Sequence, residues 1–316
     1  MGTTYNVIAI APAATSSDDL GKAIEASLTR VNKHLSNWDP TSEISRFNAT
    51  RKTTPVAISE MMAQVMATAN DVHRDSGGLF DVTLAPLIEL WGFGTRKAET
   101  PLPAPEKIAA AQAKVGQLKL LKLDRGASTM VKRDVQVTIN LSAIAKGFGV
   151  DEVAAVLNRF NVENYMVEIG GDLVTSGVNE RGQKWRIGVE KPVASSRRVQ
   201  LTVDISNLGM ATSGDYRNYK EQAGVRYSHV LNPRTGQPIK HRTASVTVLA
   251  KNAMLADAWA TALLVAGQDR GMEIAKTYNL AALFISKGNG KAGDQAAADG
   301  FVVLMSPKFM DIKGES

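Results

Sequence analysis

Asp257 and Thr261 lie four residues apart in the stretch NAMLADAWATALLV. Four residues make about one helical turn, so on a helix both side chains point from the same face. Their neighbours are apolar or small, and a carboxylate in such surroundings costs free energy unless it is paired or binds a cation. A carboxylate beside a hydroxyl is the hard-oxygen chemistry that suits Mg²⁺. The spacing allows either a metal site or an aspartate hydrogen-bonded at the start of a helix.

His229 is one of only four histidines, and it lies between the strand-like RYSHVL and an Asn-Pro-Arg-Thr-Gly turn. Histidine titrates near neutral pH, so beside phosphate chemistry it is the natural general base. The alternative is a strand histidine whose imidazole is satisfied by hydrogen bonds. The residue type alone leaves both interpretations open.

Two further stretches could approach a ligand. INLSAIAKGFG joins a predicted strand to a predicted helix: its small residues admit a ligand, the helix start offers N–H donors to an anion, and Lys146 adds positive charge. GGLFDVTLAPLIELWGFG combines glycines, aromatic residues and Asp81. The first stretch could equally be an ordinary strand-to-helix turn, and the second could belong to the core.

One motif is better explained by a hairpin loop than by a nucleotide site. GNGKAG, at 288–293, fits the pattern G-x-G-x-x-G. A Rossmann site also needs a following helix, a second strand and an acidic residue about 20 positions on. The remaining residues have the pattern of a loop and one strand, so we predict a hairpin.

The elements that position these residues alternate without a regular strand-helix-strand repeat. Ser and Asp before Leu20, and Ser59 before a periodic apolar run, predict capped helices, the second ending at Gly77. NAMLADAWATALLVAG and DRGMEIAKTYN predict two successive helices, and LAALFISK and GFVVLM predict strands. We predict an α+β fold, a mixed but mostly antiparallel sheet with packed helices. We expect one domain over 1–306, with room for two subdomains, and a loose tail over 307–316.

Composition excludes several classes of function. The 316 residues include 44% hydrophobic and 22% charged residues, as in ordinary globular proteins, and no cysteine. Disulfides, cysteine nucleophiles and thiolate metal sites are therefore excluded. The net charge of +6 comes from scattered lysines and arginines, and aromatic residues make up only 6%. We therefore expect no nucleic-acid partner.

Eight segments, taken in this order, resemble the ApbE family of FAD:protein FMN transferases. They are MGTTY, LSNWDPTSEISRFN, GGLFDVTLAPLIELWGFG, INLSAIAKGFG, VEIGGDL, MATSGDYRNY, YSHVLNPRTGQPI and NAMLADAWATALLV. The resemblance covers the chain from Met1 to about Ser306. It implies Mg²⁺-dependent transfer of FMN from FAD to a Thr or Ser hydroxyl of a target flavoprotein, with a phosphoester formed and AMP released.

The resemblance also implies a role for individual residues. His229 would be the catalytic base, and the metal ligands would be the carbonyl of Ala143 with Asp257 and Thr261. The FAD-contacting residues would be Met1, Trp38, Leu79, Phe80, Asp81, Asn140, Lys146 and Leu231. Three positions depart from the family pattern: Trp38 and Asn140 replace the usual Tyr and Asp, and Asn232 replaces Asp before the proline of the turn. The change at Asn140 removes a charge near the proposed metal.

Family members act on subunits of the sodium-pumping NADH:quinone reductase, the Rnf complex and related membrane flavoproteins. The resemblance therefore implies such partners, and a periplasmic protein whose precursor is anchored to the inner membrane by a lipid. The residues at the start of the chain lack a secretory signal pattern, so that signal would lie outside the given sequence. Two alternatives remain: an FAD pyrophosphatase that uses the same site and yields FMN and AMP, and a non-catalytic periplasmic FAD-binding protein.

Overall fold

The computed structural model describes residues 2–94, 101–193, 198–216, 219–222, 224–288 and 300–314. Its centre is a sheet of seven strands in which every neighbouring pair is antiparallel. The strands, in spatial order, are β1 (Tyr5–Ile10), β5 (Asn164–Ile169), β6 (Asp172–Ser176), β9 (Gly209–Gly214), β14 (Thr243–Ala250), β15 (Ala281–Lys287) and β16 (Phe301–Met305). The predicted α+β class with a mostly antiparallel sheet is confirmed.

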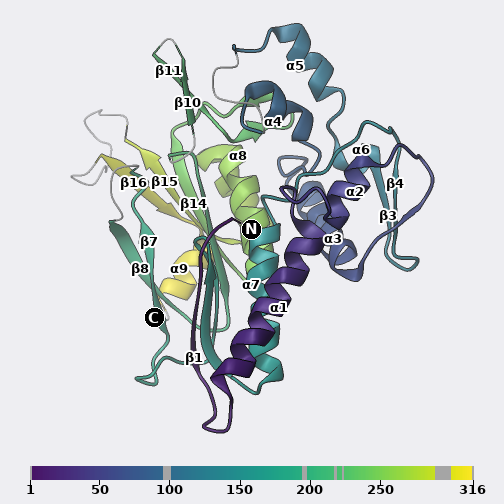
Figure 1. Cartoon of the computed structure of the whole chain (residues 1–316). Coiled ribbons are helices and arrows are strands. Elements are labelled where there is room, and N and C mark those ends of the chain that lie inside the picture. Colours follow the sequence, from purple (N-terminus) through teal and green to yellow (C-terminus); the bar gives the residue numbers. More distant parts are fainter. Residues whose placement is uncertain are drawn as a thin grey trace.

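Both faces of this sheet are covered. The helices α7 (Ala145–Arg159) and α8 (Ala253–Thr277) pack on one face, and α1 (Ser17–Leu35) packs on α7 (Figure 1). The hairpin of β7 (Trp185–Glu190) and β8 (Val199–Ile205), with α9 (Pro307–Gly314), covers the other. Along β15 the buried side chains alternate between the two cores: Ala282 and Phe284 face the helices, whereas Leu283 and Ile285 face the hairpin. Double burial explains why LAALFIS is almost continuously apolar.

Most of the smaller elements lie above and to the right of α7 and α8 in Figure 1. They are α2 (Glu43–Ala49), β2 (Val56–Ala57), α3 (Glu60–Asp75), α4 (Ala85–Trp91), α5 (Pro105–Gln112), α6 (Gln117–Leu120), β3 (Leu121–Asp124) and β4 (Thr129–Lys132), followed by β10 (Tyr219–Gln222), β11 (Val225–Ser228), β12 (Leu231–Asn232) and β13 (Gln237–Pro238). Strands β2, β4 and β3 form a three-stranded sheet, and β10–β11 and β12–β13 are hairpins. Within the described ranges, no helix is both long and apolar enough to span a bilayer.

Several helix boundaries follow from local sequence, as predicted. Ser16 and Ser59 are the N-caps of α1 and α3, and their hydroxyls accept from the amides of Asp19 and Met62, each at 3.2 Å. The two helices predicted around Gly267 form one element, α8, which is interrupted there. Gly267 has φ 76° and ψ 169°, a conformation open almost only to glycine.

The C-terminal tail differs from the prediction. Residues 307–314 form α9 instead of a loose tail, and Phe309 is completely buried in the core between the sheet and the β7–β8 hairpin. The Ser306 hydroxyl accepts from the Phe309 amide at 3.3 Å and so caps the helix. The short apolar pattern of this segment is weak evidence for a helix, which gains its stability from tertiary packing. Of the predicted loop GNGKAG, only Gly288 lies within the described residues.

Candidate functional site

The first half of α8 carries the two candidate metal ligands to one cavity. Asp257 and Thr261, one turn apart, both line a cavity of about 390 Å³ between α8, β9 and the loop before α7, which we call the α8 cavity. Asp257 is almost fully buried, and its Oδ2 accepts from the Gly147 amide at 3.2 Å. The Thr261 hydroxyl lies 3.1 Å from the hydroxyl of Ser213 on β9. The predicted shared face is confirmed.

The start of α7 supplies the third candidate ligand and a positive charge. Ala143 and Lys146 also line the α8 cavity. The Lys146 ammonium forms an ion pair with Asp172 and lies 3.7 Å from Oδ1 of Asp257. Burial lowers the pKa of Lys146, but the carboxylates of Asp257 and Asp172 raise it by more, so its pKa lies above the usual range. The ammonium therefore stays charged at neutral pH.

Gly147 makes the approach of α7 to α8 possible. A Cβ atom at Gly147 would lie 2.3 Å from the carbonyl oxygen of Ala253. Asp151, one turn further along α7, accepts from the amides of Ala253 and Met254 at 2.8 and 2.9 Å. It thus caps the start of α8 together with Asn252, whose side chain accepts from Leu255 at 3.0 Å. The two helix starts are fixed to one another, and with them Lys146 and Asp257.

His229 lies where two cavities adjoin. It follows β11 and lines both the α8 cavity and a second cavity of about 560 Å³, which we call the α4 cavity because residues of α4 line it. Its ring lies edge-on to Phe93, with 6.4 Å between the ring centroids. The turn after it is closed by the Asn232 side chain, which accepts from the Arg234 amide at 2.9 Å. His229 therefore borders both cavities where they adjoin.

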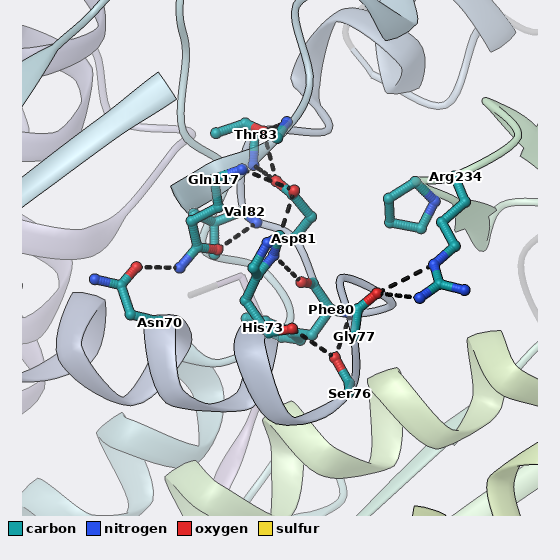
Figure 2. A network of polar contacts seen from close by, with 12 residues as sticks. Asn70, His73, Ser76, Gly77, Phe80, Asp81, Val82, Thr83, Gln117 and Arg234 are labelled. Carbon is teal, nitrogen blue, oxygen red and sulfur yellow. Dashed lines mark hydrogen bonds and ion pairs between the residues drawn. The ribbon is translucent and has the colours of Figure 1, made fainter. Parts of the chain in front are cut away.

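The loop that carries Asp81 is held by an internal polar network, drawn in Figure 2. The Asp81 carboxylate accepts from the Thr83 amide at 2.7 Å and from the Gln117 amide at 2.9 Å. His73 donates from Nδ1 to the Phe80 carbonyl at 2.7 Å, and this nitrogen lies 3.4 Å from Asp81. Asp81 borders both cavities while its carboxylate is engaged within the loop. These contacts give His73 a structural role in the loop.

Arg234 ties the same loop to the turn that follows His229. Its guanidinium donates to the Gly77 carbonyl, with the Nε contact at 3.1 Å (Figure 2). Gly77 has φ +66°, which favours glycine, and a Cβ there would lie 2.9 Å from Arg234. These hydrogen bonds therefore join the loop of Asp81 to the turn that follows His229.

The remaining candidates divide between the two cavities. Leu79, Phe80 and Leu231 line the α8 cavity, whereas Trp38 and Asn140 line the α4 cavity. Trp38 is 72% exposed, which is unusual for such a large aromatic residue. Asn140 donates its amide to the Val82 carbonyl at 2.7 Å, and its side chain accepts from the Ser142 amide at 2.9 Å. Met1 lies outside the described residues.

The donor set fits a hard cation, although it is not a cluster of acids. Among the described residues, no group of three or more His, Cys, Asp or Glu side chains could hold a metal. The α8 cavity instead brings together the Asp257 carboxylate, the Thr261 hydroxyl and the Ala143 residue, whose carbonyl is the predicted third ligand. Oxygen ligands of this kind suit Mg²⁺, which usually keeps waters and binds few protein groups.

Sequence reasoning missed three residues that support the site. Asp172 pairs with Lys146, Ser213 contacts Thr261, and Gln117 holds Asp81. Asp172 and Ser213 lie in the glycine-containing segments VEIGGDL and MATSGDYRNY, which are among the segments that resemble the family. The sequence did not indicate which residues they would contact. Gln117 lies 36 residues from Asp81, and no sequence pattern indicated that it would contact the site.

The fold and the site define the class of protein. An α+β fold whose central sheet is antiparallel carries two adjoining cavities, with oxygen donors, a lysine and a histidine converging on them. A family model described as the ApbE family matches residues 1–284. The chain belongs to the ApbE family, as the resemblance predicted.

Named relatives match most of the chain. It is 44% identical over 296 residues to an FAD:protein FMN transferase of Haemophilus influenzae, covering 92% of this chain and 86% of the relative. It is 42% identical over 288 residues to one of Vibrio cholerae, covering 91% and 85%. Among solved structures, the flavin transferase ApbE from Vibrio cholerae has a TM-score of 0.87 and 39% identity, covering 98% of this chain and 96% of that one. The apo form of the Pseudomonas stutzeri flavinyl transferase ApbE has a TM-score of 0.87 and 35% identity, covering 99% and 94%.

Proposed function

We propose that this chain is an FAD:protein FMN transferase, which moves FMN from FAD to a Thr or Ser hydroxyl of a target flavoprotein and releases AMP. Membership of the ApbE family and the names of its relatives support the activity. The observation that carries the proposal is the position of His229, which borders both cavities, one of them lined by Asp257 and Thr261. A base at that junction can serve a bound dinucleotide and an entering hydroxyl together.

In the proposed reaction, His229 takes the proton of the acceptor hydroxyl. The hydroxyl oxygen forms a bond to the phosphorus of the FMN half of FAD. The bond from that phosphorus to the oxygen shared with the AMP half breaks, and AMP leaves with the electron pair. The product is a phosphoester between FMN and the acceptor side chain.

We further propose that Asp257, Thr261 and the carbonyl of Ala143 hold a Mg²⁺ ion. Bound there, the ion would neutralise charge on the diphosphate and on the leaving phosphate. Lys146, charged and partly exposed to the same cavity, would contact the diphosphate directly. The amides of Ala145, Gly147 and Phe148 at the start of α7 already donate to Leu141, Asp257 and Ile144, so these three add no donors for phosphate oxygens.

Trp38, Asn140, Asp81, Leu79, Phe80 and Leu231 would contact FAD, and so would Met1, which is outside the described residues. The exposed indole of Trp38 suits stacking on an aromatic ring that enters the α4 cavity. Asn140 offers an amide where the family resemblance implies a carboxylate, so the α4 cavity that it lines carries less negative charge. Each cavity has a volume typical of sites for small ligands.

The family resemblance supports a proposal for the protein partners and for the cellular location. We propose acceptors of the Rnf or sodium-pumping NADH:quinone reductase type, or related membrane flavoproteins. We also propose a periplasmic location with a lipid anchor on the precursor.

The test is one incubation of the chain with FAD, Mg²⁺ and a small flavoprotein domain from an Rnf or sodium-pump subunit. Intact mass and in-gel fluorescence of the acceptor are recorded, with an acceptor whose hydroxyl residue is changed to Ala as the matched control. An acceptor heavier by one FMN, absent in the control, supports the transferase. Free FMN and AMP with every acceptor unmodified would contradict the transferase and indicate an FAD pyrophosphatase. FAD binding without cleavage would indicate a non-catalytic FAD-binding protein.

A further inference from the structure

Three charged side chains meet beside the α8 cavity, and only two of them have a role so far. Asp172 and Asp257 are almost fully buried, and the Lys146 ammonium lies near both of their carboxylates. The ammonium is in direct contact with Asp172, whereas its distance to Oδ1 of Asp257 is 3.7 Å. Asp172 therefore holds the lysine, and Asp257 is its secondary partner.

The backbone fixes Asp172 in this place. Asp172 begins β6 and pairs with Ile169 across a two-glycine turn, in which Gly170 and Gly171 have φ values of +57° and +96°. These left-handed conformations favour glycine, so the tight turn needs this pair. Unlike Lys146 and Asp257, Asp172 does not line either cavity. It contacts Lys146 without bordering either cavity.

An ammonium and a metal ion compete for the same carboxylate. Asp257 has one oxygen accepting from the Gly147 amide, and the other faces Lys146. Without Asp172, the nearest anionic partner of Lys146 would be Asp257, and the two would close into a buried ion pair. A cation would then have to displace the lysine before it could bind.

We propose that Asp172 is a positioning residue of the cation site, which holds the Lys146 ammonium to one side and so keeps the Asp257 carboxylate available to the metal. This inference rests on the proposed cation site at Asp257 and Thr261. It assigns Asp172 no contact with metal or substrate.

The test is a binding measurement with Mn²⁺ alone as the probe, using the full chain. Free Mn²⁺ is followed by electron paramagnetic resonance during titration of the wild type, Asp172→Asn, Lys146→Met and the double variant. We expect Asp172→Asn to weaken Mn²⁺ binding by about 10-fold or more, within the range for residues that orient metal ligands. In the Lys146→Met background the same change should cost less than about threefold, because the competing ammonium is gone. Lys146→Met alone should bind Mn²⁺ at least as tightly as the wild type.

The outcomes separate this inference from the proposed function. Wild-type protein that binds no Mn²⁺ would contradict the proposed cation site itself. If the wild type binds Mn²⁺, two results would overturn the positioning role alone. One is that Asp172→Asn lowers Mn²⁺ affinity equally in the wild-type and Lys146→Met backgrounds, and the other is that it lowers the affinity in neither. If Asp172→Asn does not fold, weaker binding by Lys146→Met still overturns it. Asp204→Asn is the matched control, because it removes an aspartate paired with Arg186 on the β7–β8 hairpin, and its binding should equal that of the wild type.

Discussion

His229 shows how a single residue gains a role from its surroundings. Its ring is packed edge-on against Phe93, and the turn after it is tied through Arg234 to the loop of Asp81. The imidazole is thus held at the border of two cavities by contacts on both sides. Such support is what a general base needs, because proton transfer depends first on distance and then on pKa.

We predict that His229→Ala lowers the rate of FMN transfer by about 10²- to 10⁴-fold, the usual contribution of a general base, while FAD still binds. Single-turnover kinetics measure the rate of FMN transfer to the acceptor, and flavin fluorescence measures the affinity for FAD. The matched control is His34→Ala, which removes a histidine paired with Glu43 at 2.6 Å, away from both cavities. Equal rates for both variants would remove His229 from the mechanism.

Lys132 is a residue whose charge opposes folding. Its side chain is fully buried, and its ammonium donates to the carbonyls of Asn48 and Thr50 at 3.0 and 3.1 Å, at the end of α2. Burial, with a smaller effect of Arg51, lowers the pKa of Lys132 from 10.5 to about 8. Between these pH values the unfolded chain binds more protons than the folded one, so stability rises with pH.

We therefore predict that wild-type protein gains about 2 kcal/mol of unfolding free energy relative to Lys132→Met between pH 7.5 and 9.5. The penalty is complete below pH 8 and vanishes as pH passes 10.5. Urea denaturation of both proteins at several pH values measures the difference. Parallel pH profiles would show that Lys132 has the same pKa in the folded and unfolded chains.

At the scale of elements, the contact between α7 and α8 decides the geometry of the site. One helix carries Lys146 and the other carries Asp257, and they touch at Gly147, where the two backbones meet. Asp151 caps α8 from α7, although burial raises its pKa to about 7 against the lowering effect of its two backbone hydrogen bonds. The helix pair is a single support for the site.

We predict that Gly147→Ala destabilises the protein by about 1–3 kcal/mol, because the new Cβ would overlap the Ala253 carbonyl unless the helices separate. Gly21→Ala is the matched control: Gly21 lies in α1 with nothing within 4 Å of its would-be Cβ, so this change should stabilise the helix by about 0.5–1 kcal/mol. Urea denaturation compares the two. A neutral Gly147→Ala would mean that the helices can separate without cost.

At the scale of the whole molecule, the sheet separates two cores with different tasks. The core on the helix side includes Trp259 and Leu264 of α8, the helix that carries Asp257 and Thr261. The core on the hairpin side contains Phe309 of α9 and residues of β7 and β8. Changes in the second core should therefore alter stability and leave the chemistry intact.

We predict that Phe309→Ala costs about 3–5 kcal/mol of unfolding free energy, since the ring is completely buried. Met310→Ala, at the next and 53% exposed position, should change it by less than about 0.5 kcal/mol. Thermal and urea unfolding measure both, and transfer per folded molecule at 25 °C should equal that of the wild type. A lower transfer rate in folded Phe309→Ala would show that the two cores are coupled across the sheet.

Local sequence was sufficient for features that depend on near neighbours. The caps at Ser16 and Ser59, the interruption at Gly267 and the shared face of Asp257 and Thr261 all follow from interactions within a few residues. The α+β class follows from the periodicity of the segments. Residue type and local pattern also singled out His229, Lys146 and Asp81. Candidates such as Leu231 and Ala143 came from family resemblance, because no local interaction distinguishes them from ordinary core residues.

Contacts between distant segments were not accessible from the chain. The pairing of Lys146 with Asp172 spans 26 residues, and that of Gln117 with Asp81 spans 36. Helix α9 was predicted as a loose tail because eight residues have little helical stability of their own, and burial of Phe309 against the sheet supplies the rest. Residue types and spacing specify local backbone preferences, whereas the free energy of burial and of charge pairing depends on which surfaces folding brings into contact.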